Sequence, residues 1–134
     1  MIGRRVALAG ALTLSACAAP AFVQTTLYLG RAIPGGGTVD DAALARFVAE
    51  EVVPRFPDGF TLLDATGHWR DTATGEGVRE PTVLVVVLHP PGRRAAAEAI
   101  AVAYAERFGQ QAVLRVETGA AVSFDRARPA PRQQ

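Results

Sequence analysis

The sequence predicts an α+β domain with a ferredoxin-like split β-α-β-β-α-β order, in which a four-stranded antiparallel sheet carries two helices on one face. Two segments have apolar residues at helical spacing, and four segments have the alternating or continuous apolar pattern of strands. Clusters of proline and glycine separate these segments and mark turns. This order of elements is that of the split βαβ motif. We place a single domain at residues 24–124.

The first strand is expected at residues 24–31 (QTTLYLGR), where Leu27 and Leu29 alternate with polar neighbours. A glycine-rich loop follows at residues 34–37. Residues 38–41 (TVDD) are typical of a capping box that opens a helix. The buried face of that helix is predicted to comprise Leu44, Phe47, Val48 and Val52.

The central part of the chain predicts a β-hairpin. Residues 60–71 (FTLLDATGHWRD) are expected to form the second strand, and residues 72–77 its hairpin loop. Residues 82–88 (TVLVVVL) form the expected third strand, which is apolar on both faces, as in a central strand covered on both sides.

The second helix is expected after the chain break at residues 90–92 (PPG), and it covers about 16 residues up to Phe108. Its apolar face is predicted to comprise Ala97, Ile100, Ala101, Tyr104 and Phe108. Gly109 occupies the position of a C′ glycine. Residues 113–122 form the last expected strand.

One face of the predicted sheet is left without helices. In the third strand, Val83, Val85 and Val87 point opposite to its other apolar residues, so one set must lie on the open face. An open apolar face favours a binding partner. We expect a homodimer through this face, and a ligand cavity is the alternative.

The N-terminus has the features of an export signal. Two arginines precede an apolar run at residues 6–14, followed by small residues up to Cys17. This run is too short to span a bilayer, which needs about 20 residues. Residues 14–17 (LSAC) resemble the lipobox of bacterial lipoproteins. The resemblance implies a signal peptide at residues 1–16, acylation of Cys17 and anchoring of the protein to the membrane of the cell envelope.

Two other readings of the N-terminus stay open. Residues 19–21 (APA) form an A-x-A site, and cleavage after Ala21 would release a soluble periplasmic or secreted protein. Arg4 and Arg5 also allow twin-arginine export. Because Cys17 is the only cysteine, the chain cannot form an intramolecular disulfide. In the lipoprotein reading, residues 17–23 form a short tether.

Charge argues against a nucleic-acid partner. The formal net charge of the whole chain is +1, but residues 22–124 hold nine Arg against twelve Asp and Glu, and they have no basic stripe. The Pro- and Arg-rich residues 125–134 are predicted to be a disordered tail.

The densest group of polar residues lies around the expected hairpin. If paired residue numbers sum to 150, Arg70 faces Glu80 and Asp71 faces Arg79, which gives two opposite-charge cross-strand pairs. One interpretation is that these charges stabilise an exposed hairpin. The other is a ligand site with Trp69 as a stacking platform.

In that ligand site, Arg70 or Arg79 would hold an anion and His68 would act as acid or base. Tyr28 is a further candidate, because we expect it on the open face. The same register separates His68 from His89 by about seven residues, roughly 23 Å, so we expect no metal site. We predict no cofactor.

The sequence also resembles a known family of bacterial exported proteins, the domain of unknown function (DUF) 3574. Four blocks carry the resemblance in order: LGRAIPGGGTVDD, VVPRFPDGFTLLDATGHWRD, EGVREPTVLVVVLHP and ERFGQQAVLRVETGAAVSF. It covers about residues 24–124. The resemblance implies a small α+β domain that is exported and often lipid-anchored, and it brings no activity, substrate or catalytic residue.

These observations favour a non-catalytic binding or interaction module on the cell envelope. No Ser/His/Asp arrangement is apparent in the sequence. The alternative is a small enzyme with a cavity between sheet and helices, where His68, Trp69 and Tyr28 would lie near the site.

Overall fold

The structure is a computed structural model that describes residues 21–128. Its elements are β1 (Phe22–Gly30), α1 (Asp41–Phe47), a π-helical segment (Val48–Val52), β2 (Thr61–Arg70), β3 (Gly77–His89), a 3-10 turn (Pro91–Arg93), α2 (Arg94–Phe108) and β4 (Leu114–Ala120). The strands form one antiparallel sheet in the order β2-β3-β1-β4. The predicted β-α-β-β-α-β fold is therefore confirmed.

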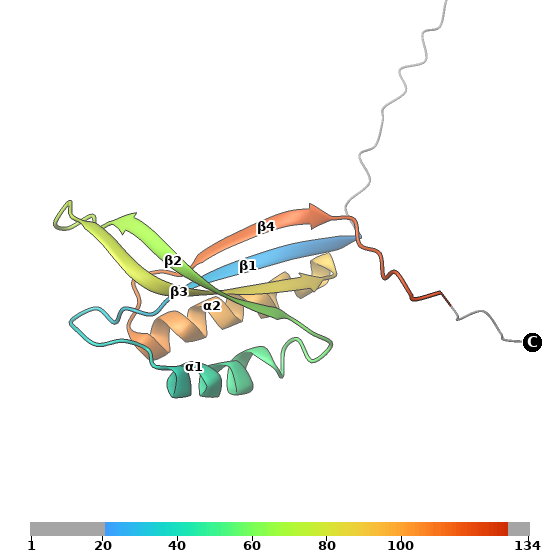
Figure 1. The fold of residues 1–134 in the computed structure, drawn as a ribbon, viewed down its shortest axis with the longest axis horizontal. Helices are drawn as coiled ribbons and strands as arrows, with labels where there is room; N and C mark the ends of the chain where they lie inside the picture. The colour runs from blue at the N-terminus through green and yellow to red at the C-terminus, as the bar shows by residue number, and fades with distance from the viewer. Residues whose placement is uncertain (1–20, 129–134) are drawn as a thin grey trace, which may run out of the picture.

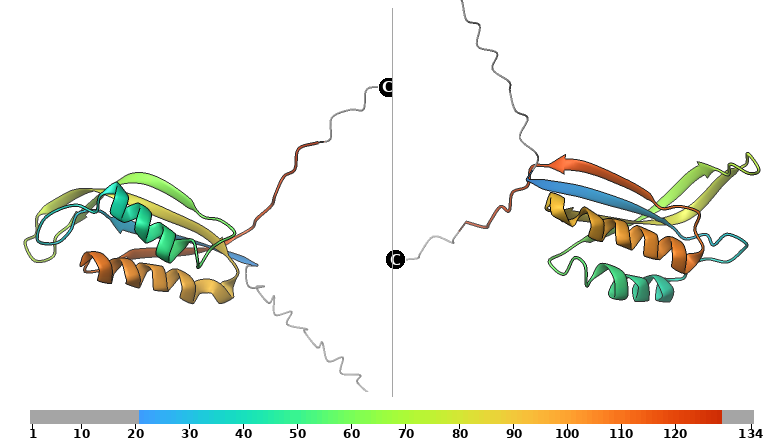
Figure 2. Two further views of the ribbon diagram at one scale, coloured as in Figure 1. Left: turned by 90° about the horizontal axis from the view of Figure 1, so that it is seen from below. Right: turned by 180° about the vertical axis from the view of Figure 1, so that it is seen from behind.

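The two helices cover one face of the sheet, as Figures 1 and 2 show from opposite sides. The chain buries its apolar core between these layers. Leu27 and Leu29 of β1 and Val85 and Val87 of β3 face the helices and are fully or almost fully buried. The helical layer contributes the buried side chains of Phe47, Val52, Ala97, Ile100, Ala101 and Tyr104.

Three aromatic rings join the helices to each other. The ring of Phe47 on α1 meets that of Tyr104 on α2 edge-on, with centroids 5.1 Å apart. Phe108 packs on Tyr104 at 4.8 Å. The predicted apolar faces of both helices pack on the core, with Leu44, Val48 and Phe108 only partly buried. Gly109 ends α2 in the left-handed conformation (φ 62°) that suits glycine.

The start of α1 differs from the prediction. The N-cap is Asp40, whose carboxylate accepts a hydrogen bond from the Ala43 N–H at 2.7 Å. Thr38, expected to open the helix, instead pairs with Ala32 in an isolated β-bridge that closes the glycine-rich loop. Because the bridge holds Thr38 in extended backbone, the helix begins later.

The β2–β3 hairpin has a different register from the one predicted. Gly67 pairs with Glu80, His68 with Arg79 and Arg70 with Gly77. The expected pairs Arg70–Glu80 and Asp71–Arg79 are therefore wrong.

The loop chemistry explains the shift in register. Asp71 belongs to the loop, where its carboxylate accepts hydrogen bonds from the N–H groups of Ala73 (2.7 Å) and Thr74 (3.1 Å). Its own N–H donates to the Glu76 carbonyl at 2.9 Å, which closes the turn. β3 consequently begins at Gly77, earlier than the expected residue 82. Both arms of the hairpin project beyond the rest of the sheet (Figure 1).

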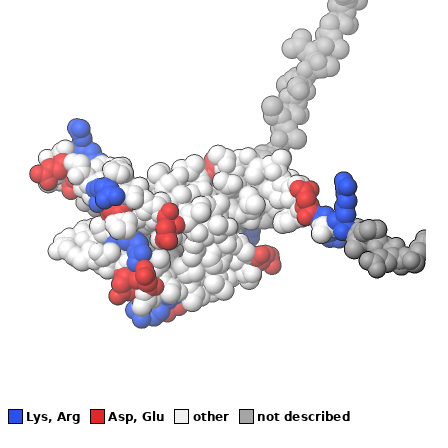
Figure 3. Space-filling view, viewed as in Figure 1, with Lys and Arg blue, Asp and Glu red and all other residues white. Residues whose placement is uncertain are grey.

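The second face of the sheet carries no helix, and we call it the open face. Each strand contributes alternate residues to it, among them Tyr28 of β1 and Leu84 of β3, which pair directly. Its exposed large apolar side chains are Leu63, Trp69, Leu88, Leu114 and Val116. In Figure 1 the strands lie in front of α2, and Figure 3, from that same side, shows charge gathered at the ends and few charges across the centre.

The predictions for the two termini lie largely outside the described residues. The signal peptide, the lipobox and Cys17 all fall within residues 1–20. Residues 121–128 are described and have no helix or strand. Within the described part of the chain, no helix is both long and apolar enough to cross a bilayer.

Candidate functional site

A buried carboxyl group lies on the open face, near the base of the projecting hairpin. Glu80 of β3 is only 2% exposed. Its Oε2 atom accepts a hydrogen bond from the Ala32 N–H at 2.7 Å. Its Oε1 atom has no hydrogen-bond partner, and it is the one buried side-chain oxygen or nitrogen of this kind among the described residues. Most buried polar groups are paired, so this oxygen requires an explanation.

Two glycines make room for the carboxyl group. A Cβ atom at Gly30 of β1 would lie 2.0 Å from Glu80 Oε1 and 2.9 Å from Cη2 of Trp69. A Cβ atom at Gly67 of β2 would lie 2.6 Å from Thr82 Oγ1 and 3.1 Å from Cζ3 of Trp69. The benzo ring of Trp69 therefore reaches from β2 across β3 to β1 and covers Glu80. We call these residues, Gly30, Gly67, Trp69 and Glu80, the Glu80 site.

Burial determines the electrostatics of this site. Loss of solvent raises the pKa of the Glu80 carboxyl above its ordinary value of 4.5, and the hydrogen bond from Ala32 opposes this with a smaller effect. On the helical side of β1, the Tyr104 hydroxyl donates to the Gly30 carbonyl at 2.8 Å. Burial raises the pKa of Tyr104 to about 12; the charge of Arg31 lowers it and that of Glu80 raises it.

The raised pKa gives Glu80 a predictable effect on stability. Between the ordinary pKa and the higher folded-state pKa, the folded chain binds more protons than the unfolded chain, so stability falls as pH rises through this window. In Glu80→Gln, which has no carboxyl group at this position, we expect this decrease in the free energy of unfolding to be absent. Urea unfolding of both proteins between acidic and neutral pH should show wild type losing stability relative to Glu80→Gln.

Glu76→Gln is the matched control, because Glu76 is an exposed carboxylate in the same hairpin. This variant shows what the loss of an exposed carboxylate outside the Glu80 site does to the pH profile. Parallel profiles for wild type and Glu80→Gln would show that Glu80 titrates alike in the folded and unfolded chains.

The candidate residues from the sequence divide between the two faces. Trp69 lies on the open face over Glu80 and is 45% exposed. His68 and Arg79 pair across the hairpin on the opposite face, and Arg70 ends β2 on that same face. Tyr28 lies on the open face, but beside Leu84 and Leu114 and not beside Trp69. The structure therefore does not bring the five candidates together.

His89 is part of the core. It is 2% exposed, its Nε2 lies 2.7 Å from Thr25 Oγ1, and its Nδ1 lies 2.8 Å from the Pro90 carbonyl. A neutral imidazole satisfies both contacts by donating from Nδ1 and accepting at Nε2. His89 also lies ten residues beyond Arg79, the partner of His68. Within residues 21–128, no cluster of three or more His, Cys, Asp or Glu could hold a metal ion.

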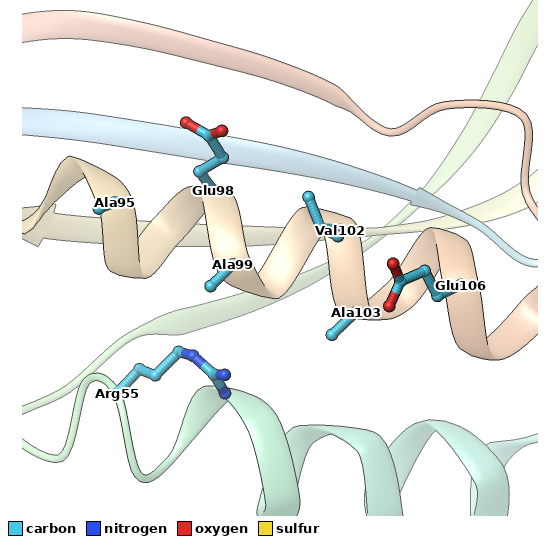
Figure 4. Close-up of a pocket in the computed structure, with 7 residues that line it drawn as sticks. All are labelled: Arg55, Ala95, Glu98, Ala99, Val102, Ala103 and Glu106. Carbon is cyan, nitrogen blue, oxygen red and sulfur yellow. The ribbon is translucent and has the colours of Figure 1, made fainter.

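The helical layer has a shallow open groove with a volume of about 440 Å³ between the segment after α1 and α2 (Figure 4). Its floor consists mostly of alanine and valine from α2, flanked by Glu98 and Glu106. Arg55 lines the other side, but its guanidinium is bound to Glu51 at 2.6 Å. Glu98 is likewise paired with Arg115 at 3.3 Å. The groove therefore offers an apolar floor and exposed carboxylates, but no buried polar group that could anchor a ligand.

Arg31 and the glycine-rich loop do not form an anion site. The Arg31 guanidinium donates to the Val39 carbonyl at 2.7 Å and to Asp41 Oδ1 at 2.6 Å. These bonds hold the loop against the start of α1. Gly35, Gly36 and Gly37 all have positive φ, so the glycines allow the turn itself.

The sequence contained a signal for Glu80 that the predicted register concealed. Glu80 directly precedes the apolar run of β3, and the strand extends through it to Gly77. Of the two glycines that make room for it, Gly67 lies on the other arm of the hairpin and Gly30 on β1, which is far away in sequence. The arrangement supplies a hydrogen-bond acceptor, a negative charge when ionised, and an indole ring at one point on the sheet.

Comparisons with known proteins give one family and one shared fold. The sequence profile of a family described as "Protein of unknown function (DUF3574)" matches residues 24–124. No curated protein matches the chain. A phage SAM lyase in complex with S-methyl-5'-thioadenosine has a similar fold, with a TM-score of 0.61 and 14% identity over 80% of this chain and 88% of the lyase chain.

A phage SAM lyase in the apo state is similar as well. Its TM-score is 0.55 at 14% identity, over 72% of this chain and 78% of the lyase chain. At this identity the likeness concerns the fold alone.

Proposed function

Because the chain belongs to the DUF3574 family, whose function is unknown, we propose a function from its own residues: an exported, lipid-anchored envelope protein whose domain is a non-catalytic interaction module. In this proposal the domain pairs with a second copy through the open face. The observation that carries it is the apolar surface that all four strands present on the side without helices.

The size of the open face suits a weak dimer. Four strands spaced about 4.8 Å apart, with about eight residues each, give a face of roughly 500 Å². Two such faces bury about 1,000 Å², which is near the lower limit for a specific interface. Lipid anchors would place both copies on one membrane, where a raised effective concentration compensates for weak affinity.

The chemistry of the open face favours a second copy over a charged partner. Leu63, Leu114 and Val116 are 49%, 60% and 40% exposed. Glu80, the carboxyl group on this face, is covered by Trp69. A two-fold interface places each patch against itself, and an uncharged patch meets no like charge when it does so.

The anchor rests on the lipobox-like residues 14–17, and Cys17→Ser tests it. We expect the intact mass of the mature wild-type protein to show acyl chains on an N-terminal Cys17, and the protein to partition into membranes. The variant lacks the thiol that accepts the lipid, so it should show no acyl mass and should not partition as an acylated protein. A wild-type chain that starts at Phe22 without added mass would instead support the soluble, exported form.

A second candidate function is a small enzyme or binder that acts on S-adenosylmethionine. The likeness to the phage SAM lyase favours it, although one fold supports many unrelated functions. The Glu80 site offers a carboxyl group and an aromatic ring for such a ligand. Calorimetric titration with S-methyl-5'-thioadenosine, and mass spectrometry of S-adenosylmethionine incubated with the protein, test this candidate with Glu80→Gln as the control. If the protein neither binds S-methyl-5'-thioadenosine nor converts S-adenosylmethionine, the interaction module remains the supported function.

A further inference from the structure

The Oε1 atom of Glu80 is a hydrogen-bond acceptor without a partner in the described part of the chain, and it lies beneath the ring of Trp69. The carboxyl group is 2% exposed, and Oε1 has no hydrogen-bond partner among the described residues. An unpaired buried acceptor destabilises the folded chain. Gly30 and Gly67 hold this space open, because a side chain at either would collide with the site.

Trp69 is only partly fixed in place over this oxygen. It is 45% exposed, and its indole N–H takes part in none of the side-chain hydrogen bonds found among the described residues. Its benzo ring rests on two glycines, which have no side chains to interlock with it. A rotation of the Trp69 side chain would therefore uncover Glu80 without breaking a hydrogen bond.

We propose that Glu80 and Trp69 bind an organic cation that carries N–H donors, a primary ammonium or a guanidinium group. The cation would donate a hydrogen bond to Oε1, the atom that has no partner. The indole of Trp69 would close over it and add a cation–π contact. A ligand of this class would donate the missing hydrogen bond to Oε1 and neutralise the buried carboxylate.

The groups around Glu80 leave the cation position open. Arg31 is bound to Val39 and Asp41. Tyr104 approaches from α2, where its hydroxyl is bound to the Gly30 carbonyl. In β2 and β3, His68 and Arg79 point to the opposite face of the hairpin, so none of these groups supplies a donor to Oε1.

A proton and the cation compete for the same carboxyl oxygen. Burial raises the pKa of Glu80, so acid protonates the site readily. Binding of the cation should therefore weaken as pH falls through the titration of Glu80.

The chain contains its own reporter for this proposal. Trp69 is its only tryptophan, so tryptophan fluorescence reports on the Glu80 site. The proposal does not rest on dimerisation, but Trp69 also lies on the open face through which the proposed dimer pairs. The titration is therefore run at a protein concentration at which light scattering shows a single chain, so that loss of the dimer and loss of the fluorescence response are separate results.

The experiment titrates the mature protein with agmatine and cadaverine while Trp69 fluorescence is recorded. Choline, a cation without N–H donors, and butanol, a neutral compound, are the ligand controls. We expect a saturable fluorescence change with agmatine or cadaverine. The affinity should be at least about tenfold lower for choline, and at least about tenfold lower for both amines in Glu80→Gln, which corresponds to about 1.4 kcal/mol of binding free energy. Glu76→Gln should respond like wild type.

A response of equal size in wild type and Glu80→Gln, or no saturable response to either amine, would overturn the proposal. Circular dichroism first establishes that each variant is folded. Should Glu80→Gln not fold, the pH series on wild type decides: the proposal requires the affinity to fall as the pH is lowered, and a constant affinity contradicts it.

Discussion

Replacement of Gly30 by alanine is expected to lower the free energy of unfolding by about 1–3 kcal/mol, the usual cost of an added group in a packed site. The new Cβ atom would lie 2.0 Å from Glu80 Oε1 and 2.9 Å from Trp69 Cη2. Neither distance is tolerated, so the carboxyl group must leave its hydrogen bond with Ala32 or the indole must lift away. Urea unfolding measures the loss, and Trp69 fluorescence reports the displaced ring.

Gly77→Ala is the matched control for this substitution. Gly77 begins β3, the strand that carries Glu80, and a Cβ atom there meets nothing within 4 Å. Its φ is not positive, so alanine brings no backbone strain either. Equal stability changes in the two variants would mean that the close packing around Glu80 does not contribute to stability.

Leu63→Asp is expected to weaken the proposed dimer by at least about 100-fold, because burying a carboxylate without a partner costs several kcal/mol. Leu63 lies on the open face of β2 and is 49% exposed, so the substitution leaves the core of the single chain intact. A two-fold interface contains the new charge twice. Sedimentation velocity over a range of protein concentrations measures the change.

Val102→Asp places the same charge on the other layer of the molecule. Val102 lies on α2 and is 48% exposed, close to the exposure of Leu63. Dimerisation should survive this change and be lost with Leu63→Asp. The opposite pattern would move the interface to the helical groove of Figure 4, which Val102 lines.

The fold could be predicted because its signals are local. The alternation around Leu27 and Leu29 identifies β1, and the spacing of Ile100 and Tyr104 identifies the buried face of α2. Gly109 ends α2 because the chain adopts the left-handed conformation there, which glycine tolerates without strain. Each of these features depends on neighbours within a few residues.

The candidate site could not be predicted with the same success, because it depends on a register. A hairpin register follows from the loop, and the hydrogen bonds of Asp71 place that residue in the loop and not in the strand. The observed register differs by an odd number of residues from the predicted one, which changes which residues of β2 and β3 share a face. The cross-strand partner of Glu80 is therefore Gly67 and not the predicted Arg70.

The sequence suggests Trp69 as a candidate stacking residue, but it does not indicate the surface on which Trp69 packs. The sequence suggested His68 and two arginines, which the structure places on the opposite face of the hairpin. The surface that Trp69 rests on is formed by Gly30 and Gly67, from two different strands. Contacts of this kind appear only after the strand order and both registers are known.

The most direct test of the interaction module is the mass of the mature protein in solution. We would measure it by light scattering over a wide range of concentrations, with Cys17→Ser to prevent acylation. We predict a mass that rises from one chain to two as the concentration increases. A mass of one chain at every concentration would contradict dimerisation through the open face.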